Sequence, residues 1–407
     1  MHHSNDPYRS TPSLYALGQV FYYSSMAIIG GYTTVYLSSK GVSDSHIGFV
    51  ISIATVTAII IQLALSSALD KYPKTLSKTP VILLSFLSGL SVALMLIFPA
   101  KASTIIILYT IALTLDKSAS SLMSTISVKS NIHITYAIPR MLGSAAYATT
   151  CLVFGKVIDR YGPSYLMYIY VPFCVITAIF MTLMPEDHIV TAAPKRDSGG
   201  SSYFSIIKEN RILRVFLIAI VILGIGHTSC LTFLIRVIEE CGGGSAQLGI
   251  TMSIQSFCEV PMLILMATVL KNKRSDRLLI ITFSAYVVRI MILAFARNIF
   301  TVYFVATMNM LCVGISSAAT INFTNLISHE DEKARCQALT ILAGGGGVGG
   351  VIGTSLSGIL LDTFGTRTTF LIGGTICLAA LLVMIYCSSL YGKTLEGRRR
   401  AVLVHCN

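Results

Sequence analysis

Charged residues are scarce in this sequence of 407 residues. Aspartate, glutamate, lysine and arginine make up 12% of the chain, whereas a soluble domain carries about 25%. Hydrophobic residues account for 54% and the mean hydropathy is +0.75. A soluble fold with so little charge could not cover its own surface, so we expect lipid to be the solvent for much of the chain. The apolar runs are continuous rather than alternating, which favours transmembrane helices over a β-barrel.

Motifs of metal binding, redox chemistry and nucleotide hydrolysis are also missing. The ten cysteines contain no C-x-x-C pair, and most lie inside apolar runs, as packing residues do. No H-E-x-x-H sequence occurs. The glycine-rich run at 343–358 lacks the G-K-S/T ending of a phosphate loop, and its small residues favour close helix packing instead. We therefore predict no enzyme, no catalytic residue, no metal site and no cofactor.

Twelve apolar stretches are each long enough to cross a bilayer, which takes about 20 residues in a helix. Six precede residue 190, six follow residue 210, and the polar sequence PEDHIVTAAPKRDSGGSS at 185–202 separates them as a linker. The predicted spans are 13–38, 45–69, 79–99, 103–127, 139–158, 164–184, 211–238, 246–270, 277–296, 299–327, 337–361 and 366–390.

An internal repeat relates the two groups of spans. GKVIDRYG at 155–162 and GILLDTFG at 358–365 both fit G-x-x-x-D-x-x-G and begin 203 residues apart. A second pair aligns Ile47-Gly48 with Leu248-Gly249, 201 residues apart. Chance similarity between apolar sequences is the alternative, but the conserved order of features favours a duplication. We predict an N-terminal six-helix bundle at 1–184, a cytoplasmic central loop at 185–210, a C-terminal six-helix bundle at 211–391 and a basic cytoplasmic tail at 392–407.

The distribution of lysine and arginine predicts the orientation. If both termini and the central loop lie on one side, that side holds 20 of the 30 basic residues and the other side holds six. The positive-inside rule then places both termini in the cytoplasm of a multi-pass protein of the cell membrane. The net charge of +12 is spread over seven short segments, which argues against a nucleic-acid surface.

Two acids, Glu259 and Asp116, lie well inside predicted spans. An ionisable group in hydrocarbon is costly, so such residues normally face a protein interior or a water-filled cavity. Gln255 precedes Glu259 by four residues and shares its helix face. Pro261 weakens the helix nearby and allows a bend at the depth where transporters build their sites. We expect Glu259 to pair with the lone base Arg289, either as a fixed link between helices or as an ion pair that a proton or substrate can break.

The remaining polar candidates have plain structural alternatives. Asp116 begins a partly polar stripe with Ser120, which a simple wet helix face would also explain. Arg140 follows Pro139 at a helix start and is either a substrate ligand or an interfacial anchor. Gln19 and Tyr22 share a face and suit a sugar or nucleoside, but also ordinary packing. Asn309 lies in a predicted span without charge, and His227 is better explained as a core histidine.

In layout, the sequence resembles the major facilitator superfamily, and within it the branch of the lactose permease and related proton-linked symporters. Arg140-Met141-Leu142-Gly143 matches an Arg-Met-hydrophobic-Gly segment of that branch, whose arginine contacts sugar. Glu259 and Arg289 match a glutamate and an arginine of its eighth and ninth helices by location and spacing. The tenth span, at 299–327, lacks the charged cluster of that permease. The resemblance thus implies the fold of two pseudo-symmetric bundles with twelve transmembrane helices, but not lactose as substrate.

We expect a secondary transporter that takes up a small polar solute (a sugar, glycoside or nucleoside) with protons by alternating access. Glu259 is the first candidate for proton coupling and Asp116 the second. The candidate substrate ligands are Arg140, Arg289, Gln255, Gln19, Tyr22 and Asn309. The expected partners are the solute, the proton and membrane lipid, with no nucleic acid, and the protein is expected to be a monomer. The alternatives are an exporter of apolar or cationic compounds, which the 15 methionines would suit, and a non-transporting membrane sensor.

Overall fold

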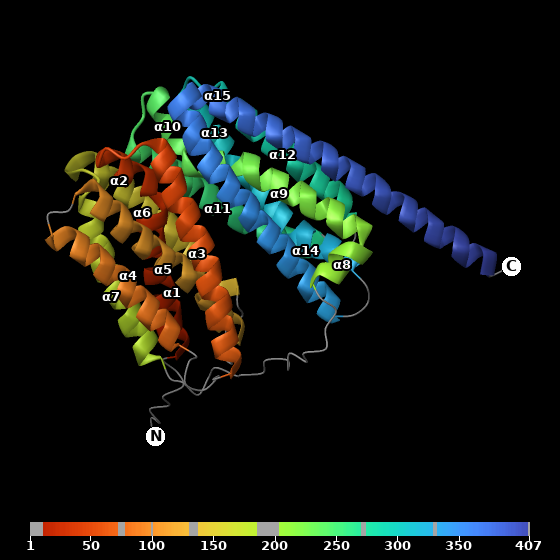
Figure 1. Cartoon of the computed structure of the whole chain (residues 1–407), viewed down its shortest axis with the longest axis horizontal. Coiled ribbons are helices and arrows are strands. Elements are labelled where there is room, and N and C mark those ends of the chain that lie inside the picture. Colours follow the sequence, from red (N-terminus) through yellow and green to blue (C-terminus); the bar gives the residue numbers. More distant parts are fainter. Residues whose placement is uncertain are drawn as a thin grey trace, which may run out of the picture. The chain divides into compact units, whose positions relative to one another are not determined.

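A computed structural model describes residues 11–71, 78–98, 101–129, 137–184, 203–269, 274–328 and 332–405. Regular structure in these residues is helical throughout, and they contain no strand. The chain forms two compact units (Figure 1). Unit 1 comprises Met1–Arg196 and Gly243–Phe257, and unit 2 comprises Asp197–Gly242 and Cys258–Asn407. Helix α11 therefore begins in unit 1 and ends in unit 2, whereas the sequence division assigned it whole to the second bundle.

Unit 1 is built from seven described helices and the first part of α11. Its buried centre is rich in tyrosine and methionine, including Tyr15, Tyr22, Met123 and Met181. Helices α4 and α5 pack on each other, and α7 packs on both α1 and α4. The helices are α1 (Thr11–Gly31), α2 (Thr33–Ser39), α3 (Asp44–Lys71), α4 (Thr79–Ile97), α5 (Ala102–Lys129), α6 (Ala137–Tyr161) and α7 (Tyr165–Leu183), with α11 at Ser245–Val269.

Unit 2 has an apolar core around Phe216, Phe283 and Phe323. Helix α9 packs most extensively on α15, which forms two arms that meet at an angle (Figure 1). The helices are α8 (Tyr203–Glu209), α9 (Arg211–Thr232), α10 (Leu234–Glu240), α12 (Ser275–Ala294), α13 (Ile299–Thr307), the π-helix η4 (Met310–Gly314), α14 (Ile315–Ile327) and α15 (Glu332–His405).

The structure has the helices of a multi-pass membrane protein, but it does not confirm twelve spans. Within the described residues, nine stretches are long and apolar enough to cross a membrane. One of them, Ala334–Thr394, is 61 residues long. It contains the predicted spans at 337–361 and 366–390 as its two arms, because only Gly365 leaves the helical conformation between them. Large apolar side chains such as Phe300 remain exposed on the protein surface, as lipid-facing residues are.

The glycine-rich run of α15 packs against α9, which confirms its predicted packing role. A Cβ atom at Gly349 or Gly353 would collide with the carbonyl oxygen of Val221 or Ile225 in α9. At Gly224, a Cβ atom would lie 3.1 Å from a carbonyl oxygen of the run. Only residues without a side chain allow the two backbones to approach this closely.

The backbone conformation shows the same internal repeat as the sequence. Among the described residues, positive φ angles occur at four glycines. Gly41 (77°) and Gly242 (76°) are 201 residues apart, while Gly162 (88°) and Gly365 (77°) are 203 residues apart. These are the offsets of the two repeated sequence motifs. Glycine is needed at these positions because a left-handed backbone crowds any Cβ atom.

A pair of helix breaks repeats with the same offset. Tyr32 separates α1 from α2 with φ −110° and ψ 18°. Phe233, 201 residues later, separates α9 from α10 with φ −113° and ψ 22°. The short helices that follow, α2 and α10, each contain seven residues. The predicted duplication is thus matched by local geometry that no single sequence motif encodes.

Candidate functional site

Arg289 of α12 is the centre of the polar cluster in unit 2. Its side chain is 1% exposed and is the largest fully buried side chain of the chain's described part. The guanidinium donates a hydrogen bond of 2.8 Å from Nη1 to Oδ1 of Asn309. The described residues provide no hydrogen-bond partner for its Nε and no ion pair for the side chain. The partner of Arg289 is therefore a neutral amide rather than Glu259, although the sequence favoured the carboxylate.

Asn309 lies where the helix of the predicted span 299–327 is broken. It follows the end of α13 and immediately precedes η4. A π-turn of this kind is uncommon and occurs often at functional sites. Thr282 of α12 donates from Oγ1 to the carbonyl oxygen of Leu311 in η4, at 3.4 Å. Helix α12 thus contacts the break twice, through Arg289 and through Thr282.

The other side of η4 contacts α11 close to Glu259. A Cβ atom at Gly314, the last residue of η4, would lie 2.8 Å from Cβ of Met262 and 3.6 Å from the carbonyl oxygen of Glu259. Pro261 lies in the same turn of α11 and cannot donate a backbone hydrogen bond there. Glu259 is partly buried. Glu259 and Arg289 therefore approach the same five-residue π-turn from two different helices.

An aromatic ring and two thiols complete this cluster. Tyr286, one helical turn before Arg289, contacts the ring of His227 with a centroid distance of 4.5 Å. Cys312 of η4 is fully buried and packs with Tyr286. Cys230 of α9 is also fully buried and lies close to the guanidinium of Arg289. Sequence reasoning missed Tyr286, which its spacing of three residues before Arg289 could have indicated.

Asp116 of α5 lies in the interior of unit 1. It is 4% exposed. Its backbone carbonyl accepts a hydrogen bond of 2.9 Å from the hydroxyl of Tyr22 in α1. Its carboxyl group lies close to the Tyr170 hydroxyl of α7, which is 2.6 Å from Oγ of Ser88 in α4. Side chains of α1 and α7 therefore contact Asp116, and Tyr170 connects it to Ser88 of α4.

Gln19 and Tyr22 belong to the same interior region of unit 1. Both side chains are buried, at 3% and 1% exposed. Gln19 donates from Nε2 to the hydroxyl of Tyr15 at 2.5 Å, and Tyr15 donates to the carbonyl oxygen of Met123 at 3.3 Å. The structure thus brings together Gln19, Tyr22 and Asp116, with the tyrosines joining α1 to α5.

Two further candidates are placed by their helices. Gln255 is buried in α11, one turn before Glu259, on the part of the helix that belongs to unit 1. Arg140 lies in the first turn of α6, and its side chain is outside the described part of the structure.

Asp159 gives the first repeat motif a structural role that the sequence did not predict. Its carboxylate accepts hydrogen bonds of 3.0 Å from the backbone N–H groups of both Ser245 and Ala246, at the start of α11. The first N–H groups of a helix have no partner within it, so a carboxylate is a favourable acceptor there. Asp159 therefore caps the helix that carries Gln255 and Glu259.

Small residues hold α6 and α11 together below this cap. A Cβ atom at Gly249 would collide with the carbonyl oxygen of Cys151. Ser253 donates from Oγ to the carbonyl oxygen of Ala148 at 2.6 Å. These contacts are all inside unit 1 and recur one turn apart along both helices. They fix the position of the N-terminal half of α11.

These features define a helical membrane protein with an internal duplication and buried polar clusters in both halves. A model of the MFS_1-like family matches residues 15–372. The chain belongs to this family of major facilitator superfamily transporters, and it is a transporter rather than an enzyme. Curated protein sequences give no match.

Several solved transporters share the fold. The nucleoside transporter NupG is 15% identical, with a TM-score of 0.74 over 94% of this chain and 99% of that one. A bacterial homologue of the human lysosomal transporter Spinster is 10% identical, with a TM-score of 0.67 over 95% and 97%. The xylose transporter XylE from E. coli is 14% identical, with a TM-score of 0.65 over 93% and 97%. At these identities the likeness concerns the fold.

Proposed function

We propose that this protein takes up a small polar solute, a sugar, glycoside or nucleoside, together with protons by alternating access. The main observation behind this proposal concerns the π-turn η4. Arg289 contacts it through Asn309 on one side, and α11 contacts it beside Glu259 on the other. The transported solutes named for NupG and XylE support the substrate class, and a solved D-xylose–proton symporter of the same fold supports coupling to protons.

Glu259 is the proposed proton carrier. A carboxylate at this depth is tolerated when it is protonated or faces a polar surrounding. Its carbonyl oxygen would lie 3.6 Å from a Cβ atom at Gly314, so we expect a change in the charge of Glu259 to affect the π-turn that Asn309 precedes. Protonation and solute binding would in this way bias the same structural element. Asp116 in unit 1 is the second candidate carrier.

Arg289 and Asn309 are the proposed solute ligands of unit 2, with Gln255 one turn from Glu259 on α11. Amide and guanidinium groups donate hydrogen bonds to the hydroxyl and carbonyl oxygens that sugars and nucleosides carry. Gln19, Tyr22 and Arg140 remain the proposed ligands of the first half. In this proposal the protein works as a monomer in the cell membrane, with both termini in the cytoplasm.

Uptake into proteoliposomes tests the proposal. Purified protein is screened with radiolabelled sugars and nucleosides, with and without an imposed inward proton gradient. The gradient should drive accumulation by the native protein. Glu259→Gln should abolish gradient-driven accumulation while retaining exchange of labelled for unlabelled solute. Glu240→Gln, which alters the exposed acid at the last residue of α10, is the matched control.

Three results would contradict the proposal. Solute accumulation that does not depend on the proton gradient would exclude proton coupling. Gradient-driven extrusion of apolar or cationic compounds would favour the exporter alternative. Absence of flux with every class of compound would favour the non-transporting sensor.

A further inference from the structure

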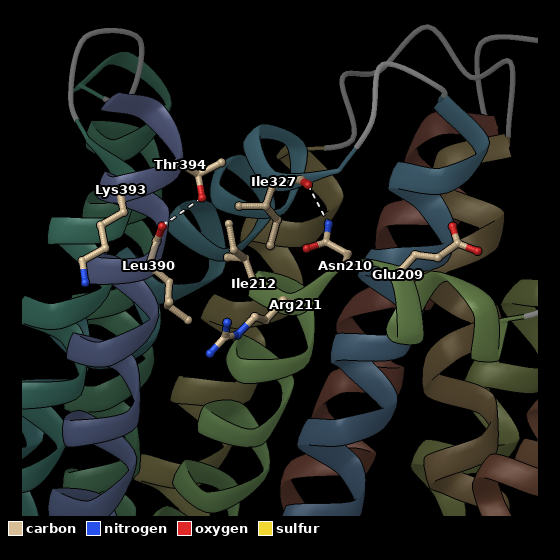
Figure 2. A pocket seen from close by; sticks show the side chains of 8 residues that line it. All are labelled: Glu209, Asn210, Arg211, Ile212, Ile327, Leu390, Lys393 and Thr394. Carbon is tan, nitrogen blue, oxygen red and sulfur yellow. Dashed lines mark hydrogen bonds between the residues drawn. The ribbon is translucent and has the colours of Figure 1, made fainter. Parts of the chain in front are cut away.

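A pocket in unit 2 (Figure 2) lies at the level where two candidate membrane spans have an end. It has a volume of about 450 Å³ and is lined by residues of the α8–α9 junction, α14 and α15. One candidate span begins at Arg211 in α9 and another ends at Ile327 in α14. Both residues line the pocket, so we expect the pocket to open at the depth of lipid headgroups.

Hydrogen bonds between helices hold the walls of the pocket in place. Asn210 donates from Nδ2 to the carbonyl oxygen of Ile327 at 2.7 Å and accepts at Oδ1 from the N–H of Leu213 at 3.0 Å (Figure 2). Arg211 donates from Nη2 to the hydroxyl of Tyr386 in α15 at 3.1 Å. The packing of unit 2 itself thus forms the walls of the pocket.

The rim of the pocket is basic and its wall is apolar. Arg211 and Lys393 are exposed, and neither forms an ion pair among the residues that the structure describes. Glu209 is the one acid among the lining residues, and it lies at the opposite side of the pocket from Lys393 (Figure 2). Ile212, Ile327 and Leu390 supply the apolar wall.

Other basic residues are close to the pocket-lining residues in the sequence. Lys208 and Arg214 flank the junction and are exposed. Helix α15 continues past the pocket to His405, and this continuation carries Arg398, Arg399 and Arg400. Positive charges beside a membrane attract anionic headgroups, and basic pockets between transmembrane helices bind them.

We propose that this pocket binds the phosphate group of an anionic phospholipid. Arg211 and Lys393 contact the phosphate, and the glycerol and first acyl carbons lie against Ile212 and Leu390. A free phosphate ion shares the anionic chemistry but has no group for the apolar wall. The position of the pocket at the ends of two candidate spans favours the lipid. This site is separate from the buried cluster at Arg289 and does not depend on the identity of the transported solute.

Native mass spectrometry of the purified full-length protein tests the proposal. The protein is titrated with phosphatidylglycerol, with phosphatidylcholine of the same acyl chains, and with inorganic phosphate. The double variant Arg211→Gln/Lys393→Gln should bind phosphatidylglycerol roughly 10- to 30-fold more weakly than the native chain. The control Lys101→Gln/Arg297→Gln removes the same two kinds of charge from other exposed positions and should change this affinity by less than about twofold.

A charge-retaining variant separates loss of the site from loss of folding. Arg211→Lys/Lys393→Arg should keep most of the affinity for phosphatidylglycerol, and all variants should keep the same weak binding of phosphatidylcholine. Equal losses in the Gln double variant and the control, or no loss in either, would overturn the proposal. Displacement of phosphatidylglycerol by inorganic phosphate would overturn the assignment to lipid and identify a site for a soluble anion.

Discussion

The guanidinium of Arg289 donates a 2.8 Å hydrogen bond to the side-chain oxygen of Asn309, and both side chains are at least 95% buried. This bond links α12 to the residue that precedes the π-turn η4. A buried cation needs hydrogen-bond acceptors because its desolvation is otherwise uncompensated. Asn309 supplies one acceptor without adding a second charge. The position of η4 and the burial of Arg289 therefore depend on each other.

Removing Asn309 tests this dependence. Asn309→Ala should lower the free energy of unfolding by about 1.5–3 kcal/mol, because a hydrogen bond to a buried charge is lost. Thermal unfolding of the purified protein measures the change. Asn322→Ala removes an asparagine of α14 that is only partly buried and serves as the control. If both variants unfold alike, the bond does not anchor the turn.

Gly314 tests the contact between η4 and α11. A methyl group there would lie 2.8 Å from Cβ of Met262, so Gly314→Ala should displace the turn from α11. Overpacking of this kind typically costs about 1–3 kcal/mol, and we expect uptake to fall by on the order of tenfold because the ligands shift.

The control for this variant is Gly344→Ala in α15, where no atom lies within 4 Å of the added methyl group. It should leave both uptake and stability unchanged or slightly improve stability, since alanine favours a helix. Native uptake by Gly314→Ala would show that the contact at Glu259 is not needed for transport.

Asp159 should stabilise the start of α11. Asp159→Ala should cost about 1 kcal/mol, which is typical for the loss of an N-cap. Hydrogen exchange should become faster at the amides of Ser245 and Ala246, the two donors that lose their acceptor. Arg160→Gln changes the neighbouring exposed residue and should leave these amides protected. Unchanged exchange in Asp159→Ala would mean that the cap does not persist in solution.

The glycines of α15 whose Cβ position would collide with the α9 backbone should tolerate no side chain. Gly353→Ala places a methyl group against the backbone of Ile225, and it should destabilise the protein by about 1–3 kcal/mol. Gly350→Ala is the internal control, because its nearest neighbour is the Thr228 hydroxyl at 3.8 Å. Equal unfolding temperatures for the two variants would contradict the close approach of α9 and α15.

The membrane class, the helical fold and the repeat could be predicted from the sequence, because they depend on local composition and on glycine at fixed offsets. The left-handed Gly162 and Gly365 lie at the ends of the two motifs that revealed the repeat. The breaks at Tyr32 and Phe233 could not be predicted, since neither residue type disfavours a helix strongly.

The partners of the buried polar residues depend on packing between helices. Spacing along the chain identified Arg289 and Asn309 separately, but nothing in either helix alone shows that they meet. Glu259 was predicted as the partner of Arg289 because the two residues are a lone acid and a lone base on adjacent predicted helices. Opposite charge was the criterion that the sequence offered. The role of Asp159 was missed for a related reason, since the two N–H groups that donate to it lie 86 and 87 residues further along the chain.

Proton entry that accompanies solute uptake tests the central claim most directly. A pH-sensitive dye inside proteoliposomes reports whether adding the solute outside acidifies the interior. With the native protein, a transported sugar or nucleoside should acidify the interior, whereas Glu259→Gln should still exchange the solute without acidification. Solute entry with no change of internal pH in the native protein, or the same acidification in Glu259→Gln, would contradict the account.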